Sequence, residues 1–390
     1  MNACPPEVSL HLLISSHAFH PSIGGLERTS ELLAEEFCRA GHQVELVTAT
    51  PNRDTAWDVR QPFQIWRQPS IWKRLRLLVR ADRVLTNGAS LSMALPAVLL
   101  RKPLVIIHTG YHLVSVDGLG WGNEGPTPLH HVASLTLYRS RMTPQAWVRQ
   151  LLLLRLRIWV AHRAATNVAI THWVANRQPL PRQKVIPNPV ALPPAEPGVK
   201  SITWQERPIE LLFLGRLVQE KGLGVVLDAL AELRLSYGLR PKLSVVGEGP
   251  MHQTWLEHSE QLGLTGQVQF LGSQRGSALR ECLGQARIGV VPSLCEEPMG
   301  IVAIEMLAAG LVTVVSKRGG LAEVVGLAGV CVPNGDVHAW AACLQKLLHN
   351  PAICLRHLEH ASSTVQAFKP NVIAERYLRV LACAPHNGID

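Results

Sequence analysis

Two alternating patterns, one in each half of the chain, constrain its fold more than any other feature. Short runs rich in β-branched residues alternate with longer amphipathic stretches that have helical spacing. This order is typical of parallel sheets covered by helices on both faces. The expected strands are 10–15, 44–48, 83–86, 104–108 and 184–187 in the first half, and 209–215, 243–247, 268–272, 288–292 and 312–316 in the second. The pattern predicts an α/β protein with two doubly wound, Rossmann-like parallel-sheet domains.

A proline-rich stretch separates the two patterns. Residues 187–208 hold six prolines and show no periodicity, which indicates an interdomain linker at 191–208. The predicted domains are therefore 1–190 and 209–370, a division that suits a chain of 390 residues. The remaining segment, 371–390, begins with a helix-like pattern after Lys369-Pro370. This helix either caps the second domain or crosses back to the first.

The composition is that of a folded protein in a reducing compartment. Apolar residues make up 47% of the chain and charged residues 17%, which excludes a disordered protein. The eight cysteines are scattered, with no CxxC pair, and are interpreted as buried thiols. The N-terminus lacks a basic signal-peptide region, and no apolar run approaches the ~20 residues that span a bilayer. We expect a cytoplasmic protein, with peripheral association on the inner face of the membrane as a further expectation.

Positive charge is concentrated in the first half. Residues 1–190 hold 21 Lys and Arg against 11 Asp and Glu, whereas the remainder holds 17 against 18. Two basic amphipathic stretches, 70–80 and 144–165, lie in this half. They are either ordinary helices facing a core or a surface for anionic lipid or a lipid-linked acceptor. Nucleic acid is not an expected partner, because no helix-turn-helix, zinc or RNP-type signal is present.

Two loops that follow expected strands carry features of an anion site. Arg216 and Lys221 lie between the first strand of the second half and the next helix. Cations near a helix N-terminus are electrostatically unfavourable unless an anion lies there too. In the first half, Gly24 and Gly25 precede a helix and either leave bare amides for an anion or form a plain turn.

The stretch "EEPMGIVAIEMLAAG" (296–310) combines two carboxylates with a helix start. It follows the expected strand 288–292, and the carboxyl ends of such strands are where open α/β sheets place their ligands. Glu297 lies in the loop, and Glu305 lies about one turn into the helix. Between them are the amides of Gly300, Ile301 and Val302. The arrangement suits a ligand with a diphosphate at its centre and hydroxyl-rich sugars at each end.

Five motifs together resemble a known family. "PSIGGLE", "GRLVQEKG", "VVGEGP", "EPMGIVAIEMLAAG" and "GGLAEVV" resemble, in this order, the retaining glycosyltransferases of family 4. The resemblance is strong over 209–335 and weaker over 1–190. It implies the GT-B fold, in which two Rossmann-like domains face each other across a cleft. It also implies transfer of a hexose from a nucleotide-diphosphate sugar to a glycan or lipid-linked acceptor, in polysaccharide or glycolipid biosynthesis.

The resemblance also implies roles for individual residues. Glu297 is implied to touch the transferred sugar, and Glu305 to hold the ribose hydroxyls. His108, in "LVIIHTGYH", resembles the histidine near the reacting sugar and joins Glu297 as a catalytic candidate. The remaining matches concern the donor's phosphates: Arg216 and Lys221 as cations, and Gly24 and Gly25 as the loop that closes over them. Met299 stands where the family more usually has Phe or Gly.

The expected chemistry needs neither a metal nor a cofactor. The chain has seven Asp and no D-x-D, while cations and amides are available to stabilise the leaving diphosphate. In the family that the chain resembles, the leaving phosphate itself takes the acceptor's proton on the same face. Two alternatives remain: a catalytically inactive sugar-nucleotide-binding subunit, and another GT-B enzyme such as an epimerase or a phosphorylase.

Overall fold

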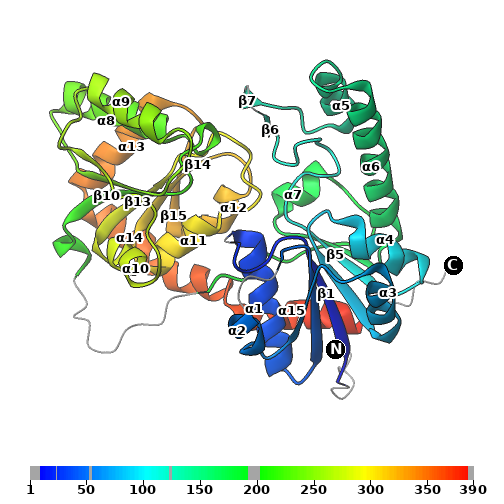
Figure 1. Ribbon diagram of the computed structural model, residues 1–390. Coiled ribbons are helices and arrows are strands. Elements are labelled where there is room, and N and C mark those ends of the chain that lie inside the picture. The colour runs from blue at the N-terminus through cyan, green and yellow to red at the C-terminus, as the bar shows by residue number, and fades with distance from the viewer. Residues whose placement is uncertain (1–8, 23, 52–54, 123–124, 192–202, 385–390) are drawn as a thin grey trace. The chain divides into compact units, whose positions relative to one another are not determined.

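The computed structural model describes residues 9–22, 24–51, 55–122, 125–191 and 203–384 (Figure 1). The chain divides into two compact units. The first contains Met1–Gly118, Pro128–Ala191 and Phe368–Asp390, and the second contains Leu119–Thr127 and Leu192–Ala367. Most of the predicted linker 191–208 lies outside the described residues.

The first unit is built on a seven-stranded parallel sheet with the strand order β3-β2-β1-β4-β5-β8-β9. Its strands are β1 His11–Ser16, β2 Gln43–Thr48, β3 Gln64–Arg67, β4 Arg83–Asn87, β5 Leu104–His108, β8 Thr166–Ala169 and β9 Gln183–Val185. Its helices are α1 Gly25–Arg39, α2 Thr55–Val59, α3 Ile71–Arg80, α4 Leu91–Leu99, α5 His131–Arg139, α6 Pro144–Arg163, α7 His172–Arg177 and α15 Pro370–Ala382. The segment Leu119–Thr127, which belongs to the second unit, contains a separate antiparallel ribbon of β6 Trp121–Gly122 and β7 Gly125–Pro126.

The second unit has a six-stranded parallel sheet with the order β12-β11-β10-β13-β14-β15. Its strands are β10 Ile209–Leu214, β11 Leu243–Val246, β12 Val268–Phe270, β13 Ala286–Val291, β14 Val312–Ser316 and β15 Gly329–Val332. Its α-helices are α8 Leu223–Tyr237, α9 His252–Gln261, α10 Gly276–Gln285, α11 Ile301–Ala308, α12 Leu321–Val325, α13 Val337–His349 and α14 Pro351–Gln366. A 3-10 helix, η2 Gln219–Lys221, precedes α8.

The predicted pair of doubly wound parallel-sheet domains is confirmed. Every expected strand is present within a few residues of its predicted bounds, but β3, β8 and β15 of the two parallel sheets were not predicted, nor was the short ribbon of β6 and β7. Strands β3, β8 and β15 have four residues each, which leaves little alternation to recognise, although β9, β11 and β12, with three or four residues, were predicted. The expected arrangement of the two domains across a cleft stays a prediction.

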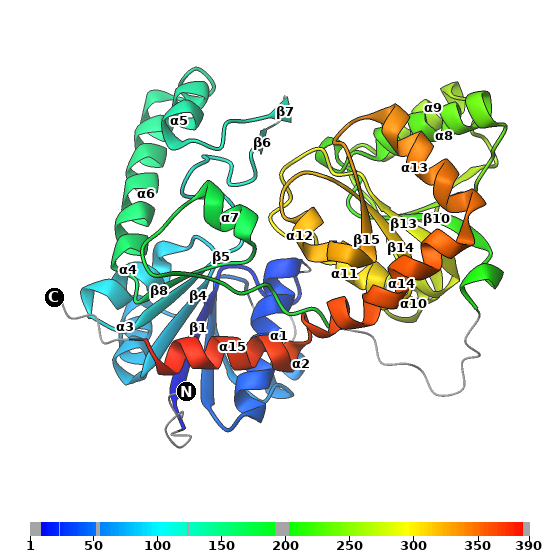
Figure 2. The same cartoon turned by 180° about the vertical axis from the view of Figure 1, so that it is seen from behind.

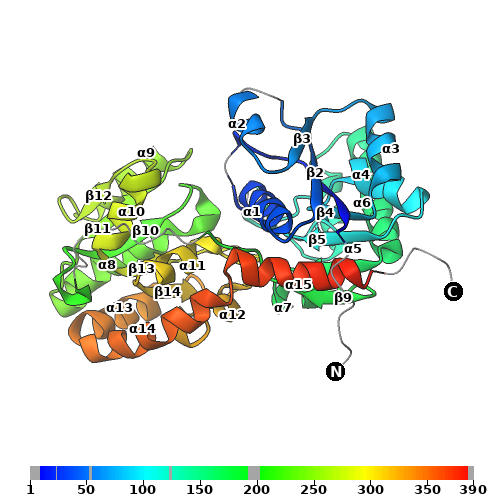
Figure 3. The same ribbon diagram turned by 90° about the horizontal axis from the view of Figure 1, so that it is seen from below.

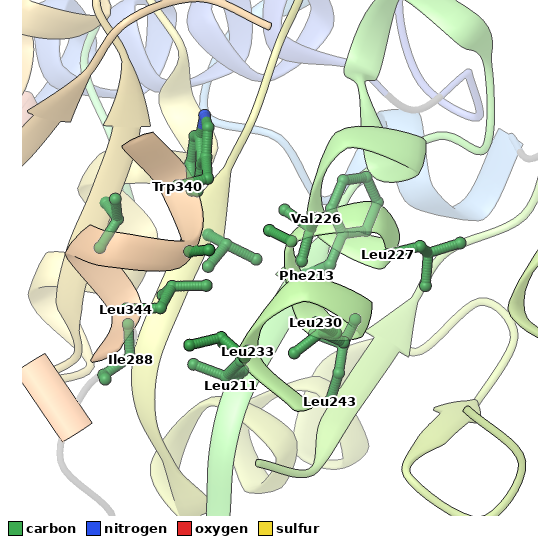
Figure 4. Close-up of a cluster of buried hydrophobic side chains, with 14 of the residues drawn as sticks. Leu211, Phe213, Val226, Leu227, Leu230, Leu233, Leu243, Ile288, Trp340 and Leu344 are labelled. Carbon is green, nitrogen blue, oxygen red and sulfur yellow. The ribbon is translucent and has the colours of Figure 1, made fainter. Parts of the chain in front are cut away.

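The core of the second unit fills the space between its sheet and two helices, as Figure 4 shows. Leu211 and Phe213 of β10 pack with Leu227 of α8 and with Trp340 and Leu344 of α13. Each such side chain contributes roughly 1.5–3 kcal/mol when it is fully buried. The loops at the carboxyl edge of the sheet are therefore attached to strands that are held by a well-packed core.

Helix α15 packs on the first unit, beside α1 and the sheet (Figures 2 and 3). Tyr377 is fully buried there, and the Arg83 Nε donates to the Leu381 carbonyl oxygen at 2.8 Å. Arg376 Nη2 donates to the Val185 carbonyl oxygen, also at 2.8 Å. Of the two placements that the sequence left open for this helix, the structure has the return to the first unit.

Helix α3 exposes much of its apolar side. The pattern of 70–80 separates the apolar side of the helix from its basic side, but only Leu77 and Leu78 are buried. Trp72 and Val79 are 79% and 62% exposed, on the same side of the helix as Arg76. The helix is amphipathic, as expected, but it packs through Leu77 and Leu78 in its C-terminal half and leaves much of its apolar side exposed to solvent, next to Arg76.

Candidate active site

The site of the second unit lies where the strand order reverses. Strand β10 pairs with β11 on one side and with β13 on the other, so the connections after β10 and β13 leave the same edge of the sheet as neighbours. Such a switch point is the usual ligand site of a doubly wound sheet. The loop after β10 carries Arg216 and Lys221, and the loop after β13 carries Glu297.

Gly222 allows these two loops to touch. Its backbone is left-handed, with φ of 71°, and a Cβ at this position would overlap the Pro292 carbonyl oxygen. Beside it, the Leu294 amide donates to the Glu220 carbonyl oxygen at 2.8 Å. Only glycine satisfies both the conformation and the close approach, so the side chains that flank Gly222 are held against the β13 loop.

Lys221, Glu297 and Ser293 form a hydrogen-bonded cluster between the loops. The Lys221 ammonium pairs with Glu297 Oε1, which also accepts a hydrogen bond from Ser293 Oγ at 3.1 Å. Burial alone raises the pKa of Glu297, but the Lys221 charge and the two hydrogen bonds outweigh it, so the pKa falls below its usual value. For Lys221, burial lowers the pKa, but the negative charge of Glu297 has the opposite and stronger effect, so the pKa of Lys221 rises above its usual value. Both groups are charged at neutral pH.

The glycine pair Gly319-Gly320 holds the backbone of Glu297 in place. The Gly320 amide donates to the Glu297 carbonyl oxygen at 2.7 Å. Gly319 has φ of 72°, and a Cβ there would overlap the Glu297 backbone. Neither this role of "GGLAEVV" nor that of Ser293 was predicted from the sequence. The available signal was a glycine pair three residues after the end of the expected strand 312–316.

The start of α11 lies next to this cluster in sequence. Gly300 is left-handed, with φ of 84°, and is the residue before the helix begins. The first amides of the helix, at Ile301 and Val302, have no acceptor within it and are suited to an anion. Glu305 lies on the next turn, and burial raises its pKa. Among the described residues its carboxylate accepts no hydrogen bond, so a ligand hydroxyl is a fitting donor.

Arg216 differs from Lys221, although the sequence paired them. Its side chain is 69% exposed, and its Nη2 lies 3.6 Å from Glu220 Oε1. Exposed pairs of this kind contribute about 0–1 kcal/mol. Arg216 is therefore a surface cation available to a ligand, whereas Lys221 is already bound to a carboxylate.

The candidates of the first unit lie around its own switch point, between β1 and β4. Gly24 precedes α1, and the Glu27 carboxylate folds back beside it and accepts a hydrogen bond from Ser22 Oγ at 2.9 Å. Gly25 is the first residue of α1. The predicted anion site at this helix start is thus flanked by a carboxylate of the chain itself.

His108 ends β5 and is buried. Its Nε2 lies 2.9 Å from Asn167 Oδ1, and the Asn167 amide nitrogen donates to the carbonyl oxygens of Ala161 and Pro181. Because Asn167 already uses its NH₂ group, Nε2 of His108 must carry the proton, and Nδ1 keeps its lone pair. Burial lowers the pKa of His108 to about 4, against a smaller opposing effect of Asn167, so the ring is neutral. Sequence analysis missed Asn167.

Two possible features are absent from the described residues. No group of three or more His, Cys, Asp or Glu side chains there is arranged to hold a metal ion. In the same ranges, no helix has the length and apolar character that crossing a membrane requires.

Both halves of the chain match models of known protein families. Residues 23–192 match the model of Glycosyltransferase Family 4, and residues 198–364 match the model of Glycosyl transferases group 1. The chain is 35% identical to glycogen synthase of Mycobacterium tuberculosis over 40% of its length, and 30% identical to phosphatidyl-myo-inositol mannosyltransferase of Mycobacterium leprae over 46%. These segments span only 37% and 47% of the two relatives.

A solved structure extends the likeness over both units. The crystal structure of Anabaena HepE in complex with UDP-glucose has a TM-score of 0.71 and covers 96% of this chain and 99% of its own, at 17% sequence identity. This likeness concerns the fold. The two family matches, in the order and at the boundaries of the two units, and the shared fold show that the chain belongs to the family 4-like glycosyltransferases of the GT-B fold.

Proposed function

We propose that the protein is a retaining glycosyltransferase that transfers a hexose from a nucleotide-diphosphate sugar to a glycan or lipid-linked acceptor. The observation that carries the proposal is the buried cluster of Lys221, Glu297 and Ser293 at the switch point of the second sheet. A buried carboxylate is costly to keep ionised, and two partners, Lys221 and Ser293, are arranged here to do so. A protein that needed only a stable loop would be served as well by apolar packing.

The cluster suits the cleavage of a sugar–phosphate bond. As that bond breaks, positive charge develops on the sugar ring and negative charge on the diphosphate. An ionised Glu297 contacts the sugar and stabilises the positive charge on its ring. Lys221, Arg216 and the α11 amides stabilise the negative charge on the diphosphate. The leaving phosphate takes the proton of the acceptor hydroxyl on the face where the new bond forms, which preserves the configuration of the sugar. Glu305 accepts hydrogen bonds from the ribose hydroxyls.

The donor proposal is supported by the structural relative HepE, which was crystallised in complex with UDP-glucose. For the acceptor, the relatives differ: one is named for glycogen and the other for phosphatidyl-myo-inositol. Both names fit polysaccharide or glycolipid biosynthesis, which we propose as the setting. A catalytically inactive binding subunit has no need of an ionised Glu297. The buried ion pair of Lys221 and Glu297 therefore disfavours that alternative.

Slow hydrolysis of the donor tests this function without knowledge of the acceptor. Purified wild type is screened against UDP-, GDP- and ADP-hexoses, and the best donor is then used with Glu297→Gln and Glu296→Gln. Glu296 is the matched control, because it is adjacent in the same loop and lies 3.8 Å from Arg318 rather than beside Lys221. We expect Glu297→Gln to lose about 10²–10³-fold in turnover and Glu296→Gln to stay near wild type. Equal turnover of the two variants would remove Glu297 from the reaction.

We propose further that the protein is cytoplasmic and that its first unit binds the anionic inner face of the membrane. The exposed face of α3 carries Trp72 and Val79 together with Arg76, and Leu99 at the end of α4 is 66% exposed. Lys102 Nζ donates to the carbonyl oxygens of Val79 and Ala81, so the ends of α3 and α4 lie together. Apolar side chains among cations are what an interface with anionic lipid requires.

A further inference from the structure

Helix α6 lies in a part of the chain that carries no acidic residue. Residues 125–195 contain nine Lys and Arg and no Asp or Glu, and the net charge of the whole chain is also +9. Helices α5 and α6, which pack together, both lie within this range (Figure 1). The positive charge of the chain is therefore concentrated around these two helices, where it favours an anionic partner.

The outward side of α6 is apolar. Val148 and Leu152 are 47% and 61% exposed. Leu156 and Trp159, which follow at helical spacing on the same side, are half-buried. Leu154, on the opposite side, is buried against the rest of the first unit. We call Val148, Leu152, Leu156 and Trp159 the α6 stripe. An exposed row of large apolar side chains of this kind is typical of a surface that another apolar body covers.

An open hollow with a volume of about 600 Å³ follows the stripe. Four of its lining residues have large apolar side chains: Val148, Leu152, Leu153 and Leu156. The charged residue of the lining is Arg149. The volume is in the range of sites that hold a small molecule, and the lining suits a hydrocarbon chain that ends in an anionic group.

Cations flank the stripe. Arg149 and Arg155 are exposed, and the helical repeat places them on opposite sides of the stripe. The Arg163 guanidinium lies 4.1 Å from the centroid of the Trp159 ring. Arginine can lay its apolar stem along such a surface while its charged head stays in a polar layer. Apolar side chains between cations are the arrangement of a helix that lies in a membrane interface.

The stripe extends the apolar and basic surface that α3 begins. Helix α4 packs against both α3 and α6, so the three helices belong to one layer of the first unit. Leu99 and Leu100 at the end of α4 are also exposed, at 66% and 41%. One bilayer surface would therefore meet apolar side chains from all three helices.

We propose that α6 is a second lipid-binding element, whose stripe enters the acyl-chain boundary of an anionic bilayer. A lipid chain occupies the hollow, and lipid phosphates lie at Arg149 and Arg155. The inference rests on the membrane part of the proposed function and names the helix that inserts. A second copy of the chain is a poor occupant, because it would bring the same cations face to face. Nucleic acid offers no apolar surface for Val148 and Leu152.

Co-sedimentation of the full chain with phosphatidylglycerol vesicles at low salt tests the apolar contact. Val148→Gln with Leu152→Gln removes two exposed members of the stripe without changing the charge. Leu235→Gln with Leu327→Gln is the matched control, because these leucines of the second unit are 79% and 73% exposed. We expect partitioning to fall by at least about tenfold in the first double variant and to stay at the wild-type level in the second. Equal partitioning of the two would overturn the proposal.

The charge contribution has its own pair of variants. Arg149→Gln with Arg155→Gln should bind phosphatidylglycerol vesicles at least about tenfold more weakly, since each cation near the lipid surface adds to binding. Lys346→Gln with Arg356→Gln, at exposed positions of the second unit, should bind as wild type does. Replacing Arg149 and Arg155 by Lys keeps the charge and should keep most of the binding. Full binding by the Gln variant of α6 would place the lipid phosphates elsewhere and contradict the proposal.

Three further measurements separate the possible failures. Donor hydrolysis should be equal in wild type and in the α6 variants; it tests the glycosyltransferase by itself, so a protein that hydrolyses donors and ignores anionic vesicles defeats only the lipid proposals. Binding that Arg76→Glu with Arg80→Glu weakens, and that the α6 variants leave intact, defeats the role of α6 alone. Sedimentation velocity without lipid should show a monomer; a dimer that Val148→Gln with Leu152→Gln dissociates would overturn the proposal and assign the stripe to a second copy.

Discussion

At the scale of single residues, Lys221 and Glu297 depend on each other for stability as well as for chemistry. Lys221→Met leaves the Glu297 carboxylate buried beside Ser293 without its cation. Breaking a buried pair in this way costs about 3–5 kcal/mol, whereas removing both charges is often nearly neutral. The loss of activity in a Lys221 variant therefore has a structural component that the sequence did not suggest.

A double variant separates the two components. We expect Lys221→Met to lower the denaturation midpoint of the second unit and Lys221→Met with Glu297→Gln to recover most of that loss, while both stay inactive. Urea denaturation followed by tryptophan fluorescence, together with donor hydrolysis, measures this. If the single and double variants unfolded at the same urea concentration, the pair would not be coupled.

His108 is the second residue whose state is fixed by a neighbour. With a pKa of about 4, it is neutral at pH 7, and Asn167 holds its proton on Nε2. The folded pKa lies below the unfolded value of 6.5, so the unfolded chain takes up the proton first. This group's contribution to stability is therefore lost as the pH falls from 6.5 towards 4.

Asn167→Asp tests this assignment. A carboxylate beside Nε2 favours the charged ring, so we expect the pKa of His108 to rise towards or above its ordinary 6.5. Ring NMR of His108 in both proteins reports the pKa and the tautomer, and donor hydrolysis should fall near neutral pH as Nδ1 loses its lone pair. Titration of wild-type His108 near 6.5 would contradict the assignment.

At the scale of elements, the turn between η2 and α8 determines whether the site is assembled. Gly222 and Gly238 flank α8, and both are left-handed, with φ of 71° and 66°. A Cβ at Gly222 would overlap the Pro292 carbonyl oxygen, whereas a Cβ at Gly238 meets open space. The two positions thus share the conformational cost of alanine and differ only in the clash.

We expect Gly238→Ala to lose about 1–2 kcal/mol with normal activity, which is the cost of left-handed backbone alone. Gly222→Ala should lose more stability and also lose activity, because the Lys221 loop must move away from the β13 loop. Urea midpoints and donor hydrolysis measure both effects. Activity in Gly222→Ala equal to that in Gly238→Ala would show that the close approach of the loops is not needed.

The strands and helices also show which features of the site could be predicted from the sequence and which could not. The strands β10 and β13 are long apolar runs with turn residues after them, so the switch-point site was predictable from pattern alone. The ion pair of Lys221 with Glu297 was not, because the two residues are 76 positions apart and only strand order brings them together. The orientation of α3 stayed open in the sequence for a similar reason: which side of a helix is covered depends on its neighbours.

At the scale of the whole molecule, the charge division predicts binding to anionic lipid. Vesicles containing phosphatidylglycerol should sediment with wild type at low salt and release it at high salt, since each surface Lys or Arg contributes about 1 kcal/mol. Arg76→Glu with Arg80→Glu should weaken binding. The matched control is Lys346→Glu with Arg356→Glu, two exposed residues of the second unit with the same change in charge. Equal sedimentation of the two double variants would make the α3 face an ordinary surface.

Metal independence of the proposed reaction is a second prediction at the scale of the whole molecule. The chain has no D-x-D, and Arg216 and the α11 amides are available to the diphosphate beside the ion pair of Lys221 and Glu297. We therefore expect donor hydrolysis to continue in excess EDTA. Loss of turnover that manganese restores would mean that a metal ion stabilises the diphosphate instead.

The central claim is that the cluster of the second unit cleaves a sugar–phosphate bond with retention. The most direct measurement is time-resolved proton NMR of donor hydrolysis by wild type, with the Glu297→Gln variant as the blank. From an α-linked donor such as UDP-glucose, the account predicts that the α anomer of the free sugar appears first and mutarotates only afterwards. A β anomer formed first would contradict retention, and no enzyme-dependent sugar release from any UDP-, GDP- or ADP-hexose would contradict the glycosyltransferase itself.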